Sequence, residues 1–280
     1  METRTFIVYC SPAGSTKHVA GVIQQQLESL RSDPFTLDLG RQRDWSSIIE
    51  MFKNSHTENI LFIGSPVHRG LAVPPVMQFI EALPNLESSS AVPFITWGRA
   101  SSGVALWQMG RALVQKGFAI AGAAKVVSTH SLMWDMDAPL GNGHPDAEDD
   151  RMVKELVSIV MTGFIHDNVR VLGLEALDYQ PEPQATEMRK KLSQPPPATP
   201  PTVDKEKCNR CAICEYECPV AAIALSPYPE FNSNCFNCFN CVRCCPEMAI
   251  EPEIPLEKLH KMIRKHSETM NETPPSQIIA

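Results

Sequence analysis

Cysteine is concentrated in one short region of this 280-residue chain, where nine of the ten cysteines fall between Cys208 and Cys245. A pattern of the form C-x2-C-x2-C-x3-C-P occurs there twice, beginning first at Cys208 and again at Cys235. Thiols repeated at such short spacing, in a chain without an export signal, indicate metal ligands rather than a disulfide framework. We therefore expect this region to fold around inorganic centres, with free buried thiols as the other interpretation.

Residues 203–253 resemble the bacterial-type ferredoxins that carry two [4Fe–4S] clusters, with all eight ligand positions of that family filled. In such ferredoxins three closely spaced cysteines of one run hold one cluster, and the fourth, which precedes the proline, reaches the other cluster. The resemblance implies that the first cluster is bound by Cys208, Cys211, Cys214 and Cys245. It implies that the second cluster is bound by Cys218, Cys235, Cys238 and Cys241.

Zinc is the main alternative for this region, because paired C-x2-C motifs also build four-cysteine zinc sites. Zinc sites usually separate their two pairs by a dozen or more residues, whereas three cysteines follow one another here at x2 spacing, twice. Cys244 is left over, because a run that included it would need a further cysteine where Met248 stands. We expect Cys244 to pack beside a cluster, with a chemically active thiol as the alternative.

Residues 1–180 alternate short apolar segments with segments of helical periodicity. Five strands are predicted, at residues 5–10, 35–39, 59–64, 92–97 and 119–127. Helices are predicted at 16–30, 44–53, 74–83 and 103–117, with a last one after Pro145 that Asp146 caps. This alternation predicts a doubly wound α/β domain with a five-stranded parallel sheet, although periodicity does not reveal the strand order.

A loop rich in small and hydroxyl residues joins the first strand directly to the first helix. Ser11, Ala13, Gly14, Ser15 and Thr16 belong to it, and a helix N-terminus behind such a loop binds anions through its N–H groups and dipole. The loop matches neither the P-loop pattern nor G-x-G-x-x-G, so a dinucleotide is not indicated. The sequence predicts a phosphate-binding site here.

This region resembles flavodoxins, whose corresponding loop binds the monophosphate of FMN. One departure is Ala13, where many relatives have threonine, so that one hydrogen bond to the phosphate is expected to be missing. The resemblance assigns two further strand-end loops to the flavin ring, namely Ser65, Pro66, Val67, His68, Arg69 and Gly70, and then Trp97, Gly98 and Arg99. Either Trp97 or His68 is expected to stack on the ring. A fold that has lost its flavin and only docks a partner is the alternative.

Composition divides the chain into four parts. Residues 1–180 form the predicted FMN-binding domain, and seven prolines mark 181–202 as a semi-rigid linker that favours polyproline II. The ferredoxin-like domain is predicted at 203–253. Residues 254–280 are predicted to hold an amphipathic helix at 256–270 and a frayed tail. The helix is expected to pack on one of the domains, with a membrane anchor as the other interpretation.

The whole arrangement resembles the flavodoxin–ferredoxin fusion family of anaerobic bacteria and archaea, over residues 5–253. The resemblance implies electron transfer between the two clusters, FMN and a low-potential redox protein. An FMN-dependent reductase of a small molecule, fed by the clusters, is the alternative. Its substrate pocket would be roofed by residues 131–145, with Trp134 and His144 as candidate contacts.

Charge and hydropathy narrow the expected surroundings. The formal net charge is −7, which offers no basic surface for nucleic acid. No apolar run approaches the roughly 18 residues that span a bilayer. Because residues 1–10 also lack the features of an export signal, we expect a cytoplasmic protein. The sequence does not predict an oligomeric state.

Overall fold

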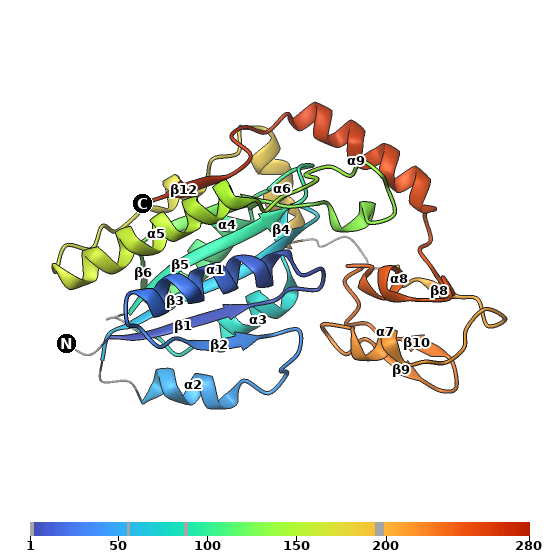
Figure 1. The fold of residues 1–280 in the computed structure, drawn as a ribbon, viewed down its shortest axis with the longest axis horizontal. Helices are drawn as coiled ribbons and strands as arrows, with labels where there is room; N and C mark the ends of the chain where they lie inside the picture. The colour runs from blue at the N-terminus through green and yellow to red at the C-terminus, as the bar shows by residue number, and fades with distance from the viewer. Residues whose placement is uncertain (1–2, 55–56, 87–88, 194–198) are drawn as a thin grey trace.

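A computed structural model describes residues 3–54, 57–86, 89–193 and 199–280 of the chain. Figure 1 shows a larger α/β part and, at one end of it, a smaller part that contains the cysteine repeat. A long C-terminal helix then runs back from the smaller part to the larger one. Among the described residues, no helix combines the length and the apolar character needed to cross a membrane.

Five parallel strands form the centre of the larger part. In spatial order they are β2 (Phe35–Asp38), β1 (Arg4–Tyr9), β3 (Asn59–His68), β5 (Ser89–Trp97) and β7 (Ala123–Val127). This is the flavodoxin-like order, in which the direction of winding changes at the first strand, between its two neighbours. The predicted fold class is confirmed, and the carboxyl ends of β1, β3, β5 and β7 meet at one edge of the sheet.

The sheet is larger than the predicted five strands. The predicted strand at 119–127 is divided into β6 (Phe118–Ile120) and β7, which both pair with β5. A short strand β4 (Leu71–Ala72) turns back on the end of β3, and an antiparallel strand β12 (Gln277–Ile279) pairs with β7.

Helices cover both faces of the sheet, because the strand residues are apolar on both sides. One face is covered by α2 (Ser46–Lys53), α3 (Pro74–Ala82) and α4 (Ala105–Gln115), and Phe6 and Val8 of β1 point into the core on that side. The other face is covered by α1 (Ser15–Ser29) and α5 (Ala147–Ile165), and Ile7 and Tyr9 of β1 point into the core there. Strands buried on both faces have this uninterrupted apolar pattern. The predicted cap of α5 is confirmed, since Asp146 accepts hydrogen bonds from the N–H groups of Glu148 and Asp149.

Part of the predicted proline-rich linker is helical. Helix α6 (Gln184–Ser193) follows a single 3-10 turn, η2 (Leu174–Leu177), and buries Ala185 and Met188 against Val104. The polyproline II conformation predicted for this segment is therefore wrong over α6. All seven prolines lie outside α6. Every residue of this helix therefore has a backbone N–H that can form a helical hydrogen bond. Pro195, Pro196 and Pro197 lie outside the described residues.

The predicted C-terminal helix is confirmed as α9 (Leu256–Met270), but the predicted frayed tail is wrong. After α9 the chain returns to the larger part as β12, where Ile278 lies opposite Ala124 of β7 and Ile279 packs into the core. This strand is short and carries no periodic signal of its own. It is held by its ladder with β7 and by tertiary contacts just before it, including the hydrogen bond from Trp97 Nε1 to the carbonyl of Pro275 (2.8 Å) and that from Val127 N to Ser276 Oγ (3.0 Å).

The cysteine repeat is also a repeat of structure. It contains two short helices, α7 (Ile213–Tyr216) and α8 (Asn240–Cys244). It also contains two antiparallel strand pairs: β8 (Thr202–Val203) pairs with β11 (Ile250–Glu251), and β9 (Ile223–Leu225) pairs with β10 (Pro229–Phe231). The two helices begin at equivalent positions of the two cysteine runs. Residues with positive φ also recur at equivalent positions, in the pairs Arg210 and Asn237, Ala212 and Phe239, and Ala221 and Met248.

Candidate functional site

Eight cysteines line two separate cavities in the smaller part of the protein. The first cavity is lined by Cys208, Cys211, Cys214 and Cys245. The second is lined by Cys218, Cys235, Cys238 and Cys241. These are the two sets that the ferredoxin resemblance implies, including the exchange of the fourth cysteine between the halves. The structure thus brings the predicted ligands together, and their ligation of iron stays a prediction.

The backbone around the two cysteine sets has the same conformation and the same hydrogen bonds. Cys214 and Cys241 lie on α7 and α8, and the loops before these helices turn through residues of positive φ. The fourth cysteine of each run accepts a hydrogen bond from a backbone N–H shortly after it, as Cys218 Sγ does from Ala222 (3.2 Å) and Cys245 Sγ from Ala249 (3.3 Å). Hydrogen bonds to cluster sulfurs tune the reduction potential.

The sulfur atoms are too far apart for a single zinc ion. With Zn–S bonds of about 2.3 Å, all four sulfurs of a zinc site lie within about 4.6 Å of one another. Among the residues described, no three cysteine sulfurs lie within 4.8 Å of one another. The spacing therefore favours a larger centre over the zinc alternative. The extra thiol of Cys244 lines neither cavity and lies 3.7 Å from the carbonyl oxygen of Cys241.

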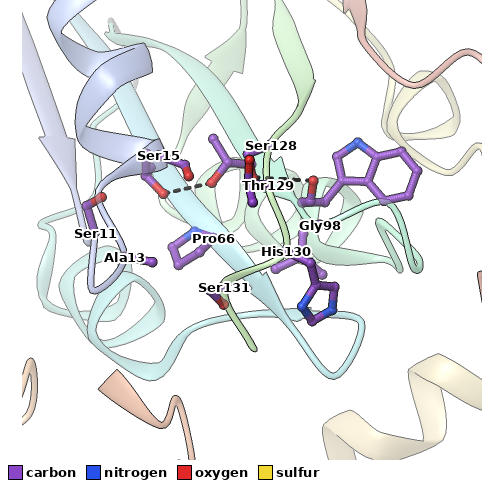
Figure 2. Close-up of a pocket in the computed structure, with 13 residues that line it drawn as sticks. Ser11, Ala13, Ser15, Pro66, Gly98, Ser128, Thr129, His130 and Ser131 are labelled. Carbon is purple, nitrogen blue, oxygen red and sulfur yellow. Dashed lines mark hydrogen bonds between the residues drawn. The ribbon is translucent and has the colours of Figure 1, made fainter. Parts of the chain in front are cut away.

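Four strand ends of the larger part surround a pocket, shown in Figure 2. The loop after β1 contributes Ser11, Ala13, Ser15 and Thr16; the end of β3 contributes Pro66 and Val67; the end of β5 contributes Thr96, Trp97 and Gly98. The predicted loops thus meet at one place. Residues 128–131, after β7, also line the pocket, and of these only Ser131 belongs to a segment that the sequence placed near the flavin. They follow a predicted strand, so the rule that located the other loops applies to them as well.

The first loop of this pocket leaves a helix N-terminus open to a ligand. Helix α1 begins at Ser15 behind Gly14, which has φ of 97° and no side chain that could cap the helix. Ser11 Oγ accepts a hydrogen bond from Lys17 N (2.9 Å), and Thr16 Oγ1 lies 2.8 Å from Thr96 Oγ1. These bonds tie the loop to the helix and to β5. N–H groups and hydroxyls around a helix N-terminus suit a phosphate.

A second cavity, of about 520 Å³, adjoins this pocket and lies between the two parts of the protein. It is lined by the loop 67–70, by residues 98–101 and 130–132, and by side chains of α6, α9 and the cysteine region. Four of its apolar residues come from the cysteine region and α9, namely Phe239, Leu259, Met262 and Ile263. The contribution of α9 was not predicted.

His68 is the predicted flavin contact that best fits this cavity. Its ring packs edge-on against Phe236, with 5.5 Å between the ring centroids. Burial, together with the nearby charge of Arg69, lowers the pKa of His68 to about 4. Its Nε2 atom is buried and has no hydrogen-bond partner within the described part of the chain. A polar atom of this kind is costly unless a ligand satisfies it, so the residues present fit a bound flavin.

Trp97 lines the pocket, but its indole is buried, so that its stacking on a flavin stays a prediction. The side chain is 1% exposed, and Nε1 donates a hydrogen bond to the carbonyl of Pro275 (2.8 Å). The indole is therefore covered by the C-terminal segment. The sequence could not show this contact, because the two residues are 178 positions apart.

Two other predicted flavin residues have structural partners. Ser65 Oγ accepts a hydrogen bond from Val73 N (2.9 Å) and lines neither the pocket nor the large cavity. Arg99 is held by the C-terminal segment, since its guanidinium donates to the carbonyl of Glu272 (3.3 Å) and its own carbonyl accepts from Ser267 Oγ (2.7 Å).

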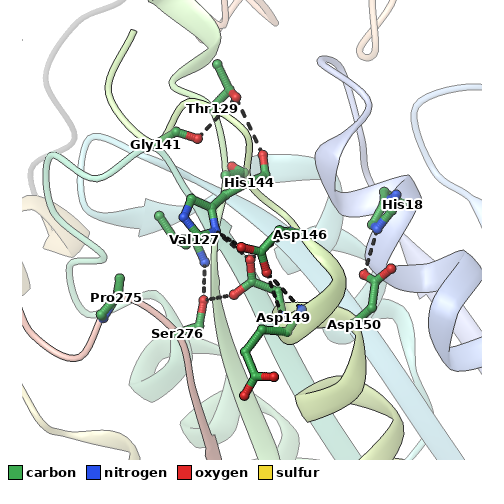
Figure 3. Close-up of polar contacts among 12 residues, drawn as sticks. His18, Val127, Thr129, Gly141, His144, Asp146, Asp149, Asp150, Pro275 and Ser276 are labelled. Atoms are coloured by element: carbon green, nitrogen blue, oxygen red, sulfur yellow. Dashed lines mark hydrogen bonds and ion pairs between the residues drawn. The ribbon is translucent and has the colours of Figure 1, made fainter. Parts of the chain in front are cut away.

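The segment 131–145 reaches the cavity through Ser131 and Leu132 only. Trp134 packs against the core of the cysteine region instead. Figure 3 shows that His144 turns toward Asp149, and its Nδ1 lies 2.6 Å from Asp149 Oδ2. Neither residue lines the cavity, so the structure does not place them as contacts of a substrate over the flavin.

The second cysteine set lies directly against the flavodoxin-like part. Cys238 lines both its own cavity and a small pocket shared with Ala13 and Pro66. An arginine of α8, Arg243, donates a hydrogen bond to the carbonyl of Pro12 (3.0 Å) in the phosphate-type loop. On the other side of this junction, Arg43 donates to the carbonyl of Cys218 (3.3 Å). The second set, not the first, therefore adjoins the candidate flavin site.

Comparisons with known proteins find similarities to two parts of the chain. A family model described as a 4Fe–4S binding domain matches residues 201–224, and a search of curated proteins finds no match. Among solved structures, rubredoxin oxygen:oxidoreductase from the anaerobe Desulfovibrio gigas is 16% identical with a TM-score of 0.47, and the match covers 60% of this chain. It covers only 37% of that protein.

Flavodoxins are also similar in structure. A flavodoxin from the domain Archaea is 18% identical, with a TM-score of 0.42 and coverage of 57% of this chain and 97% of that one. A Streptococcus pneumonia flavodoxin is 16% identical, with a TM-score of 0.42 and coverage of 57% and 99%. The strand order of the larger part is flavodoxin-like, and residues 201–224 carry the features of 4Fe–4S binding.

Proposed function

We propose that the protein is an electron-transfer iron–sulfur flavoprotein that binds two [4Fe–4S] clusters and FMN and exchanges electrons with a low-potential redox protein. The observation that carries this proposal is the shared wall at Cys238, which lines both the cavity of the second cysteine set and a pocket bounded by Ala13 and Pro66. A cluster held there would be the nearer neighbour of the flavin. In this arrangement the first cluster would be the one farther from the flavin.

The residues of the chain have separate roles in this relay. Ser11, Ser15 and Thr16 would bind the phosphate of FMN at the N-terminus of α1. The neutral ring of His68 would offer Nε2 to the flavin without adding a charge beside it. Apolar side chains from the cysteine region and α9 would exclude water from the junction. The flavin supplies the capacity to hold two electrons and release them singly, whereas the protein supplies position and electrostatics.

The resemblance to flavodoxin–ferredoxin fusions supports the same function and leaves the redox partner unidentified. We propose a cytoplasmic setting, because the cytoplasm keeps thiols reduced and this function needs eight cysteine ligands. Protein purified without oxygen should contain about eight irons per chain, four for each cluster. It should also release FMN on denaturation. Four or fewer irons would refute the two-cluster assignment, and absence of FMN would favour a flavodoxin-like half that only docks a partner.

A second candidate function, an FMN-dependent reductase of a small molecule, is favoured by one observation. The cavity of about 520 Å³ is in the size range of ligand pockets. Rapid turnover of a quinone or a nitro compound by the reduced protein, with no protein partner present, would establish this candidate. Slow turnover of both classes would leave electron transfer to a protein as the function.

A further inference from the structure

The second half of the cysteine repeat forms an internal docking face against the flavodoxin-like part. Phe236 packs on His68 and on the core beneath α3 and α4. Asn237 is 2% exposed and donates a hydrogen bond to the carbonyl of Thr199 (2.5 Å). Arg243 donates to the carbonyl of Pro12 (3.0 Å). This face brings the second cysteine set to the junction.

The repeat creates an equivalent face around the first cysteine set, and that face is open. The counterparts of Phe236, Asn237 and Arg243 in the first half of the repeat are Asn209, Arg210 and Tyr216. All three are exposed, and the side chain of Tyr216 is 73% exposed. The flavodoxin-like part contacts this face at its edge, where Arg41 lies over the Tyr216 ring at 5.0 Å and pairs with Glu217.

Large apolar side chains are also exposed close to the first cysteine set, where Ile213 lines its cavity and the N–H of Met248 donates to the carbonyl of Cys245 (3.2 Å). Ile213 and Met248 are 39% and 76% exposed, respectively, and are among the few large apolar side chains left uncovered in the described structure. Cys211, a predicted ligand of the first cluster, is exposed as well. We call the surface formed by Asn209, Arg210, Cys211, Ile213, Tyr216 and Met248 the outer face. Aromatic residues and methionine are typical of the centres of protein interfaces.

We propose that the outer face is the docking surface for the external redox protein, and that this partner presents a basic rim around its own redox centre. The proposal rests on the proposed electron-transfer function and adds the place of electron exchange. Residues 203–253 carry eight Asp and Glu against four Lys and Arg, and the bound clusters would add negative charge. A second copy of this chain would bring like charge to the face and is disfavoured.

Such an interface is transient and governed by electrostatic steering. Complementary charge raises association rates by a factor of 10 to about 1000, and the gain falls as salt is added. Cys208, Cys211, Cys214 and Cys245 would hold the first cluster beneath this face. When bound, that cluster would supply one-electron exchange with the partner, in which one centre is oxidised, the other is reduced and no proton moves. Glu215 and Glu247 directly precede Tyr216 and Met248 of the outer face in the chain, and they form no ion pair within the described residues. Glu247 also accepts a hydrogen bond from Asn209 Nδ2 (3.0 Å).

The test uses the full-length holo protein, reduced with dithionite, and a basic ferricytochrome c as the electron acceptor. Stopped-flow rates of haem reduction are measured at several salt concentrations. The double variant Glu215→Lys with Glu247→Lys should lower the second-order rate about tenfold at low salt and flatten its salt dependence. The matched control, Glu81→Lys with Glu155→Lys, makes the same change in net charge on exposed positions of α3 and α5 and should keep the wild-type rate.

A third variant, Tyr216→Ser, tests the apolar part of the face and should lower the rate at every salt concentration. Equal rates for the outer-face variant and the control would overturn the proposal, because electrons would then leave by another route. Iron and flavin contents are measured on the same samples. Loss of FMN or of half the iron in the wild-type protein would refute the proposed function instead, so the two failures can be told apart.

Discussion

The C-terminal tail depends on one buried ion pair, and its removal should be costly. Glu272 Oε1 lies 2.8 Å from Lys125 Nζ of β7, and the two side chains are 9% and 2% exposed. Glu272 also accepts hydrogen bonds from the backbone N–H of Ser102 (2.9 Å) and from Gln180 Nε2 (3.0 Å). Burial alone would raise the pKa of Glu272, but Lys125 and the hydrogen bonds from the side chain and backbone of Ser102 together lower it.

Glu272→Gln keeps the shape of this side chain and removes its charge. Lys125 is then left buried without a counter-ion, a change that typically costs about 3–5 kcal/mol. Lys125→Met should be comparably destabilising, because Glu272 then loses its partner. The double variant removes both charges and should lie within about 1 kcal/mol of the wild type, because replacing a whole buried pair is often nearly neutral.

The assay is urea unfolding followed by far-UV circular dichroism, without oxygen and at equal iron content. Each single variant should lower the urea midpoint at an unchanged slope, so that the shift reports the loss of stability, and the double variant should stay near the wild-type midpoint. Hydrogen exchange gives a local reading at Val127, whose N–H bonds to Ser276 Oγ (3.0 Å) and should lose protection in Glu272→Gln. If the single variants stay within about 0.5 kcal/mol of the wild type, as substitutions at exposed sites usually do, the tail is frayed as its sequence alone suggests.

Three further predictions concern the candidate sites. Cys244→Ser should keep about eight irons per chain, whereas Cys245→Ser should lose a cluster and retain about four; equal losses in iron assays would contradict the ligand assignment. Ala13→Thr adds a hydroxyl to the phosphate-type loop and should tighten FMN binding about 2- to 10-fold, as measured by quenching of flavin fluorescence; unchanged affinity would place the phosphate elsewhere. Burial, and then His260, lowers the pKa of His130 from 6.5 to about 4. The folded state therefore favours the neutral ring, whereas the unfolded state binds a proton below about pH 6.5. The free energy of unfolding is unaffected by this group above pH 6.5 and decreases as the pH falls toward 4. His130→Asn should retain the cap on Leu132 N and flatten the decline in urea midpoint between about pH 7.5 and 5.5; an unchanged decline would contradict this assignment.

Local patterns were sufficient for much of the fold. The apolar segments predicted the parallel strands, because a strand buried on both faces needs apolar residues at every position. The helices followed from periodicity and from caps such as Asp146. The internal repeat predicted which cysteines gather, since loops of identical spacing take identical turns, as Ala212 and Phe239 show by their positive φ. The strand-end rule then located the candidate flavin loops.

Contacts between distant segments were decided by the tertiary structure. The sequence presents two equivalent faces of the cysteine repeat, and only packing shows that Phe236 and Arg243 turn one of them inward. The strand order, the covering of Trp97 and the pairing of Glu272 with Lys125 also belong to this class. Periodicity records which residues are buried within one element, but not which distant element buries them. An edge strand such as β12 has no local signal, because its stability comes from the hydrogen-bonding groups of β7, which lies far earlier in the chain.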